Sequence, residues 1–209
     1  MQEEKKQLTT PENANPGKPE GEDGHKMLKR MNTSHAPLRE WGFEPVEWKP
    51  KMHILDEGCG GGATIADMLQ YSADSIVEGI DHMETSVSES EAFNAEYVGT
   101  RCKVCQGDVA ALPYEADTFD LVTAVETVYF WPEIEKAFAE TYRVMKKGAT
   151  FAVFCEAGDP DNYGWSKPEG VHFRVYRPEE LKEYMEQAGM REVTFRHGPG
   201  QYIAVYGKK

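Results

Sequence analysis

The sequence predicts an α/β fold with a doubly wound, mixed sheet of seven strands, mostly parallel, with helices on both faces. Three observations support this fold class. Short apolar runs alternate with segments whose apolar residues recur every three or four positions, over residues 52–189. A glycine-rich turn follows the first apolar run. The last two runs are joined by a His-Gly-Pro-Gly turn at residues 197–200, which favours a C-terminal hairpin with an antiparallel strand.

Seven apolar runs are expected to form the strands, at residues 52–55, 75–80, 102–106, 119–125, 150–155, 192–196 and 202–206. Helical segments separate the first five runs, so those strands should be parallel, with right-handed connections. In a sheet of this kind, ligands bind beyond the carboxyl ends of the strands.

Helices are expected between the strands, at residues 63–69, 83–97, 132–148 and 178–188. The third of these has the clearest pattern. Pro132 suits its first turn, Lys146 and Lys147 suit the negative end of the helix dipole, and Gly148 suits its end. Its buried face is expected to comprise Ile134, Phe138, Thr141 and Met145.

Composition divides the chain into a tail, a lid segment and one domain. Residues 1–24 are almost free of large apolar side chains, so they are expected to form a flexible acidic N-terminal tail. Residues 25–50 are expected to form a helical lid, and residues 51–209 the α/β domain. The full length of 209 residues suits a single hydrophobic core.

Charge and composition disfavour several classes of function. Lys and Arg number 23 against 36 Asp and Glu, so the net charge of −13 disfavours nucleic acid as a partner. No apolar stretch of about 18 residues occurs, so no membrane partner is expected, and the first ten residues lack the apolar core of a signal peptide. The four cysteines are expected to be reduced thiols, typical of a cytoplasmic protein. The sequence carries no signal for an oligomeric state.

Cysteine and histidine spacing predicts no metal site. Cys102 and Cys105 stand three positions apart on an expected strand, so their side chains should point to opposite faces. The six histidines are scattered without the spacing of metal ligands.

The glycine-rich turn spans residues 54–62 (ILDEGCGGG). Glycines let the backbone turn tightly and approach a ligand, and the free N–H groups at the start of the next helix suit an anionic group. Gly58, Gly60 and Ala63 fit the dinucleotide fingerprint, and Asp81, 23 residues after Gly58, suits a ribose. An NAD-dependent oxidoreductase is therefore one interpretation.

Two further carboxylates favour a different ligand. Asp56 precedes the first glycine by two residues, and Asp108 follows the third expected strand. Together with Asp81, they favour a nucleoside with a short zwitterionic tail over a dinucleotide.

Four segments carry a resemblance to a known family, at residues 54–62 (ILDEGCGGG), 79–87 (GIDHMETSV), 106–122 (QGDVAALPYEADTFDLV) and 139–154 (AETYRVMKKGATFAVF). In this order they resemble the motifs of the class I S-adenosylmethionine (SAM)-dependent methyltransferases, over about residues 40–209. Residues 27–42 and 126–138 resemble a smaller bacterial and archaeal subgroup, the short methyltransferase-11-like members. The resemblance implies a Rossmann-like fold, with SAM as the cofactor and S-adenosylhomocysteine (SAH) as the product.

The resemblance also implies a set of cofactor-binding residues: Asp56, Gly58, Cys59, Gly60, Asp81, His82, Met83, Asp108, Val109, Glu126 and Thr127. In this set, Gly58 and Gly60 line the methionine part and Asp56 braces the loop. Asp81 accepts hydrogen bonds from the ribose, and Asp108 accepts one from the adenine amino group.

The remaining residues of the set lie around the adenine and the sulfonium. His82 and Met83 depart from the usual family pair and flank the adenine, where Val109 offers its backbone. Glu126 and Thr127 are expected beside the sulfonium. A further departure is Glu57, which replaces the usual aliphatic residue.

The implied activity is methyl transfer to a small-molecule acceptor by in-line displacement. The candidate catalytic residues are Glu126, His35 and Tyr129, and His35 suits a base because imidazole titrates near neutrality. Residues 25–50, 126–131 and 156–176 are expected to shape the acceptor pocket. Two alternatives stay open: the NAD-dependent oxidoreductase, and a non-catalytic SAM-binding regulatory protein with a closed acceptor side.

Overall fold

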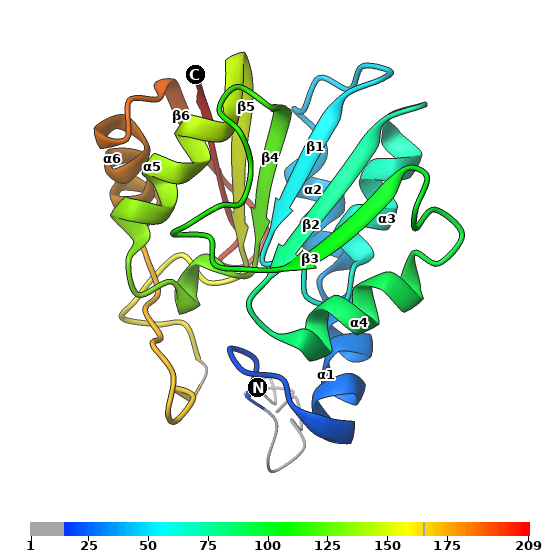
Figure 1. Ribbon diagram of the computed structural model, residues 1–209. Helices are drawn as coiled ribbons and strands as arrows, with labels where there is room; N and C mark the ends of the chain where they lie inside the picture. Colours follow the sequence, from blue (N-terminus) through cyan, green and yellow to red (C-terminus); the bar gives the residue numbers. More distant parts are fainter. Residues whose placement is uncertain (1–14, 165) are drawn as a thin grey trace.

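The structure, a computed structural model, describes residues 15–164 and 166–209. Residues 1–14, which make up more than half of the expected tail, lie outside the described residues. Figure 1 shows a central sheet with helices on either side.

Seven strands form the sheet: β1 (His53–Glu57), β2 (Ile76–Asp81), β3 (Cys102–Gln106), β4 (Phe119–Val125), β5 (Met145–Cys155), β6 (Arg191–His197) and β7 (Ile203–Lys208). Their order is β3-β2-β1-β4-β5-β7-β6. β7 runs antiparallel to both β5 and β6, and the other neighbours pair in parallel. The predicted Rossmann-like mixed sheet is therefore confirmed, and its topological switch point lies between β1 and β4.

Helices cover both faces: α1 (Gly21–Ser34), α2 (Ala36–Phe43), α3 (Ala63–Tyr71), α4 (Glu84–Phe93), α5 (Ile134–Val144) and α6 (Pro178–Gln187), with a 3-10 turn η1 (Val128–Phe130). α5 and α6 pack on one face, where Phe138 and Leu181 belong to the larger apolar core. α2 and α3 cover the other face, where Leu38 and Ile65 belong to a second apolar core.

The helix expected over residues 132–148 ends early. α5 ends at Val144, and Met145 pairs with Phe119 as the first residue of β5. The prediction that the residues from Lys146 to Gly148 end the helix was therefore wrong. Strand pairing with β4 overrides the helical periodicity at this point.

Two other boundaries differ from the expected ones. α4 ends at Phe93, because the side-chain amide of Asn94 donates to the carbonyls of Ser90 and Gly62 over 3.0 and 2.9 Å. α1 begins at Gly21, inside the segment expected to be a tail. Across the described ranges, no helix has both the length and the hydropathy of a membrane-spanning segment.

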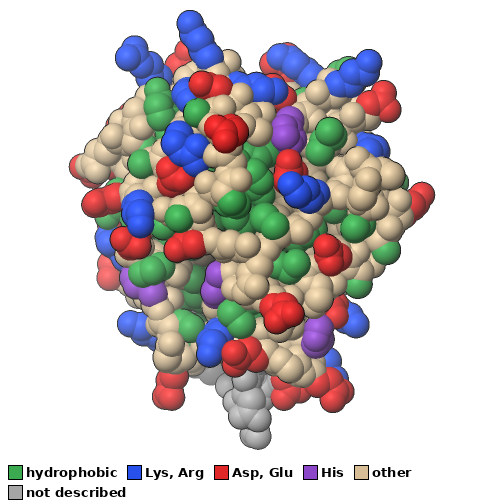
Figure 2. Space-filling model, viewed as in Figure 1, with side chains coloured by type: hydrophobic (Ala, Val, Ile, Leu, Met, Phe, Trp, Pro, Cys, Tyr) green, Lys and Arg blue, Asp and Glu red, His purple; other side chains and the backbone are tan. Residues whose placement is uncertain are grey.

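The carboxyl ends of the parallel strands meet at one edge of the sheet. In Figure 1, α1 and the dark blue segment before it lie opposite this edge. Figure 2 shows basic and acidic side chains interspersed over the same view of the molecule. The sheet edge and the N-terminal segment together frame the candidate site.

Candidate functional site

The loop after β1 depends on a glycine at position 58. Gly58 has a φ of +72°, and an added Cβ would lie 2.0 Å from Oγ1 of Thr127. The amides of Gly58 and Cys59 both donate to the carbonyl of Ile80, over 2.8 and 3.1 Å. The loop is therefore fixed between the ends of β2 and β4, and a side chain at Gly58 would break that contact.

Asp81, the last residue of β2, connects two parts of the site. Its Oδ2 accepts from the amide of Gly60 over 3.0 Å, and its Oδ1 accepts from the amide of Met83 over 2.9 Å. The carboxylate is almost fully buried and lines the cavity described below. Asp81 thus holds the glycine loop against the end of β2 while its carboxylate lies on the cavity wall.

Asp56 lies behind the loop. It is 1% exposed, and the hydroxyl of Thr123 donates to its Oδ1 over 2.6 Å. Burial raises the pKa of Asp56 to about 7. Its neighbour Glu57 is also buried, beside the hydroxyl of Thr141, and burial raises the pKa of Glu57 well above its usual range. Neither carboxyl lines the cavity.

A cavity of about 380 Å³ opens beyond the strand ends. Ten of the expected site residues lie on its wall: His35, Gly58, Cys59, Gly60, Asp81, His82, Asp108, Val109, Glu126 and Thr127. Asp56, Met83 and Tyr129 do not line it. The structure therefore brings most of the predicted set together, and leaves those three to act through neighbours.

The chain before α1 completes the wall on the side opposite the strands. Pro16, Gly17 and Pro19 line the cavity. Gly17 packs so closely on the ring of Phe130 that an added Cβ would lie 2.5 Å from a ring carbon. Asn15 donates from its side-chain amide to the carbonyl of Glu169 over 2.9 Å.

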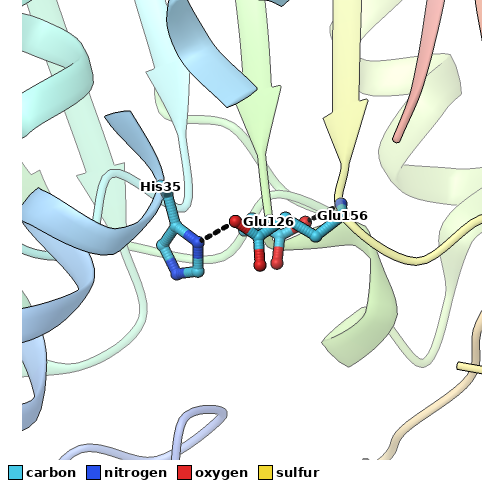
Figure 3. A group of neighbouring side chains, drawn as sticks. All are labelled: His35, Glu126 and Glu156. Atoms are coloured by element: carbon cyan, nitrogen blue, oxygen red, sulfur yellow. Dashed lines mark hydrogen bonds and ion pairs between the residues drawn. The ribbon is translucent and has the colours of Figure 1, made fainter. Parts of the chain in front are cut away.

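Three titratable side chains from three separate segments meet at the cavity wall, where His35 and Glu126 line the cavity and Glu156 lies beside them. His35 stands between α1 and α2, Glu126 follows β4, and Glu156 follows β5. Their ligand atoms all lie within 4.8 Å of one another. Figure 3 shows the second ring nitrogen of His35 and one oxygen of each carboxylate pointing to the same side, away from the strand ends.

Hydrogen bonds fix this His35–Glu126–Glu156 cluster. Nδ1 of His35 lies 2.9 Å from Oε1 of Glu156. Oε1 of Glu126 accepts from the amide of Glu156 and, over 2.9 Å, from the hydroxyl of Tyr129. Glu126 has a φ of +59°, a strained conformation for a residue with a side chain. The surrounding hydrogen bonds stabilise Glu126 in this strained backbone conformation, and such conformations are typical of functional positions.

Two groups of the cluster, Glu126 and His35, have raised pKa values. Burial raises the pKa of Glu126 to about 7, although the charge of His35 opposes the shift. Burial lowers the pKa of His35, but the hydrogen bond that His35 donates to Glu156 and the charge of Glu126 outweigh it, and the pKa lies above its usual value. Groups with such shifted pKa values in a cavity are suited to moving a proton.

Comparison with known proteins identifies a methyltransferase domain. Residues 55–153 match the family model of the methyltransferase domain. The chain is 30% identical to cycloartenol-C-24-methyltransferase of Arabidopsis thaliana over 155 residues, which are 72% of this chain and 44% of that protein. It is 28% identical to a sterol 4-C-methyltransferase of Caenorhabditis elegans over 132 residues, 63% of this chain and 38% of that protein.

Residues 55–153 thus carry a methyltransferase domain, within the fold that SAM-dependent methyltransferases share. It spans less than half the length of these two curated relatives. Because this domain includes the glycine loop, the match favours the methyltransferase motif over the dinucleotide fingerprint as the interpretation of the loop.

Solved methyltransferase structures share the fold. A SAM-dependent methyltransferase from Aquifex aeolicus aligns with a TM-score of 0.75 at 21% identity, over 88% of this chain and 97% of that chain. Human N-acetylserotonin methyltransferase in complex with SAM aligns with a TM-score of 0.71 at 14% identity, over 90% of this chain and 56% of that chain.

Several residues in and beside the cavity were not among those singled out from the sequence. Glu156 was expected only as the first residue of a pocket-shaping segment, although it ends the strand next to β4 and so shares an edge with Glu126. From the same segment, Val171 and His172 line the cavity. Asn32 donates from its side chain to the carbonyl of Gly61 over 2.8 Å, a contact without a signal in the sequence.

Proposed function

We propose that this chain is a SAM-dependent methyltransferase that transfers a methyl group to a small-molecule acceptor and releases SAH. One observation carries the proposal: a single cavity is lined both by the glycine loop, Asp81 and Asp108 and by His35 and Glu126 of the His35–Glu126–Glu156 cluster. A nucleoside site and a proton-accepting group thus share one enclosed space, as a transfer reaction requires.

The residues on the wall fit SAM. An added Cβ on Gly60 would have only Leu28 near it, at 3.8 Å, so the glycine leaves room for a ligand beside the loop. Asp81 offers a carboxylate to the ribose hydroxyls, and Asp108, with Val109, offers acceptor and backbone groups to the adenine. His82 flanks the adenine from an exposed position on the wall, and Cys59 and Thr127 complete the methionine side.

Residues outside the wall have positioning roles in this proposal. The amide of Met83 holds Asp81, and Asp56 supports the strand end beneath the loop. Tyr129 donates to Glu126 and also accepts from the amide of Ala157 over 3.0 Å. We therefore assign Tyr129 the orientation of the Glu126 carboxylate rather than contact with the acceptor.

His35 is the proposed base. Bound SAM supplies a methyl group already activated by its sulfonium charge. The chain orients the acceptor, excludes water and, where the acceptor carries a proton, removes it. The hydrogen bond to Glu156 occupies Nδ1 of His35 and leaves Nε2 to receive that proton. The carboxylate of Glu126 lies beside it and stabilises the positive charge that forms.

Two further parts of the proposal concern partners and location. The curated relatives are named for sterol and hydroquinone methylation, which are small-molecule reactions. The enclosed cavity suits an acceptor of that size, and neither nucleic acid nor a membrane is part of the proposal. A cytoplasmic location is included because all four cysteines are free thiols.

The acceptor end argues against a non-catalytic role. Phe130 and His172 line the same cavity as His35 and Glu126, so we assign the space among these residues to a second ligand. A protein that only sensed SAM would have no need of a base held in this space.

Calorimetric titration with SAM, SAH and NAD in parallel tests the proposal. We expect micromolar binding of SAM and SAH, and none of NAD. Binding of NAD alone would replace the proposal by an oxidoreductase function. Tight binding of SAM without release of SAH in the presence of any acceptor from a broad panel would favour the regulatory alternative.

A further inference from the structure

The cavity wall is strongly acidic. Four carboxylates line it, from Asp81, Asp108, Glu126 and Glu133. Arg39 is the only lysine or arginine among the described lining residues. Its guanidinium is already bound, because Nε donates to Asp67 over 2.6 Å and Nη2 donates to the carbonyl of Asn32 over 3.1 Å. An anionic acceptor would find no free cation on this wall.

Two of these carboxylates are committed to the cofactor in the proposed function. Asp81 and Asp108 lie with the glycine loop, at the nucleoside end of the cavity. The acceptor end keeps Glu126, and Glu156 stands directly behind it. One imidazole faces two carboxylates in the His35–Glu126–Glu156 cluster, so with both carboxylates ionised the cluster carries a net negative charge even when His35 is protonated.

An uncompensated buried charge is costly, so the cluster favours a cationic ligand. Glu126 is only 9% exposed. The oxygens that point away from the strand ends are the groups an incoming cation would meet (Figure 3). Apolar side chains line the same cavity, from Leu28, Met31, Phe130, Trp131 and Val171. Aromatic ring faces stabilise a cation as well as an apolar body.

We propose that the methyl acceptor is a primary or secondary amine on an apolar body, bound as its ammonium ion by Glu126 on the cavity wall and deprotonated by His35. This inference rests on the proposed function and adds the chemical class of the acceptor. It also makes Glu156 a positioning residue, since it orients His35 through Nδ1.

The step balances as a displacement at carbon. The ammonium gives one proton to Nε2 of His35, which frees the nitrogen lone pair. That pair forms the new nitrogen–carbon bond, and the electron pair of the breaking carbon–sulfur bond stays on sulfur, giving SAH. The product is an N-methylammonium ion, so the positive charge passes from sulfur to nitrogen beside Glu126. The proton on His35 returns to solvent after release.

Hydrogen bonding within the cluster favours an ammonium over a divalent metal ion. Nδ1 of His35 and Oε1 of Glu156 face each other across a hydrogen bond. Oε1 of Glu126 already accepts from Tyr129 and from the amide of Glu156. A metal ion needs several of these lone pairs at once, whereas an ammonium donates to the oxygens that point away from the strand ends.

Matched acceptor pairs test the inference on SAH-saturated protein. The panel comprises benzylamine, 2-phenylethylamine, tryptamine and octylamine, each beside the alcohol and the carboxylate of the same body. We expect amines to bind at least tenfold more tightly than their alcohols, with no binding of carboxylates, and to yield SAH when SAM replaces it. Glu156→Gln should reduce the preference for amine over alcohol about tenfold, and the exposed Glu47→Gln should not change it.

Three results would overturn the inference. The first is absence of amine binding across the panel, and the second is alcohol binding equal to or tighter than that of the amines. The third is binding of Mn²⁺, seen by electron paramagnetic resonance and lost in Glu156→Gln, which would assign the cluster to a metal. Unchanged SAM and SAH affinities in the same preparations would show that the proposed function stands while the acceptor class fails.

Discussion

Nδ1 of His35 lies 2.9 Å from Oε1 of Glu156, although 121 residues separate the two along the chain. The contact joins the junction of α1 and α2 to the end of β5, so the segment predicted as a lid supplies a side chain to the sheet edge. Because Nδ1 is bonded to Glu156, Nε2 is the imidazole nitrogen that is left to accept a proton from a ligand, as a base must.

His35→Ala removes the proposed base. We expect kcat/KM to fall by about 10²–10⁴-fold with the acceptor that the titration panel identifies, since that is the usual contribution of general base catalysis. The affinity for SAH should stay the same, because the nucleoside end of the cavity is untouched. His197→Ala, on β6 and outside the cavity, is the control. A loss confined to SAH affinity would contradict the assignment.

Asp81→Asn tests the ribose contact. The charged acceptor is lost, so SAM affinity should fall at least tenfold, or about 1.4 kcal/mol. Calorimetry provides the measurement. Asp117→Asn is the matched control, since Asp117 also loses a carboxylate but lies outside the cavity, paired with Lys209 at 2.9 Å. Unchanged SAM affinity in folded Asp81→Asn would remove Asp81 from the binding site.

Comparing Gly58→Ala with Gly99→Ala separates the steric overlap with Thr127 from the backbone strain of a positive φ. The new Cβ would overlap Oγ1 of Thr127, and φ is +72°. We expect a loss of about 2–4 kcal/mol in the free energy of unfolding by urea, from strain and overpacking together. Gly99→Ala is the control, because Gly99 has a φ of +79° and no neighbouring atom within 4 Å of an added Cβ. Equal losses in the two variants would show that the contact with Thr127 is unimportant.

In Asp56→Asn, the free energy of unfolding should depend less steeply on pH than it does in the wild type. The native pKa of Asp56, about 7, is raised above its unfolded value, so the native state binds the extra proton. Asp56 therefore makes its full contribution to the free energy of unfolding at pH values below its pKa in the unfolded state. This contribution is lost as pH rises towards 7, by up to about 1.4 kcal/mol per pH unit. Glu57 shifts in the same direction and remains in the variant.

Urea unfolding of the wild type and Asp56→Asn at several pH values between 4.5 and 7 isolates the contribution of Asp56. The difference in unfolding free energy between the two should change in favour of the variant as pH rises. A constant difference across this range would mean that Asp56 is ionised in the native state.

The sequence alone predicted those parts of the site where residue spacing and the topology of the sheet lead to the same arrangement. Spacing alone related Gly58 to Asp81, because the carboxyl ends of neighbouring parallel strands share an edge, and the structure places Gly60 3.0 Å from Asp81. It was insufficient at Met145, where a helical period continues across the point at which strand pairing begins. The spacing of apolar residues indicates that a helix is present, but it does not show at which residue the next strand begins.

Contacts between distant segments had no signal in the sequence. The pairing of His35 with Glu156 depends on how α1 and α2 pack over the sheet edge, and no spacing encodes it. The same holds for Gly17 against Phe130. Identifying Glu126 as a site residue was possible because it ends a strand at the switch point, whereas its orientation by Tyr129 required coordinates.

The segment from residue 15 to residue 20 has a consequence for turnover. Pro16, Gly17 and Pro19 form cavity wall, yet this stretch makes few backbone hydrogen bonds to the domain. We expect a spent nucleoside held behind it to leave as these residues move aside. We therefore expect the departure of SAH, and not the bond-making step, to pace the catalytic cycle, and an initial burst of methylated product would record that delay.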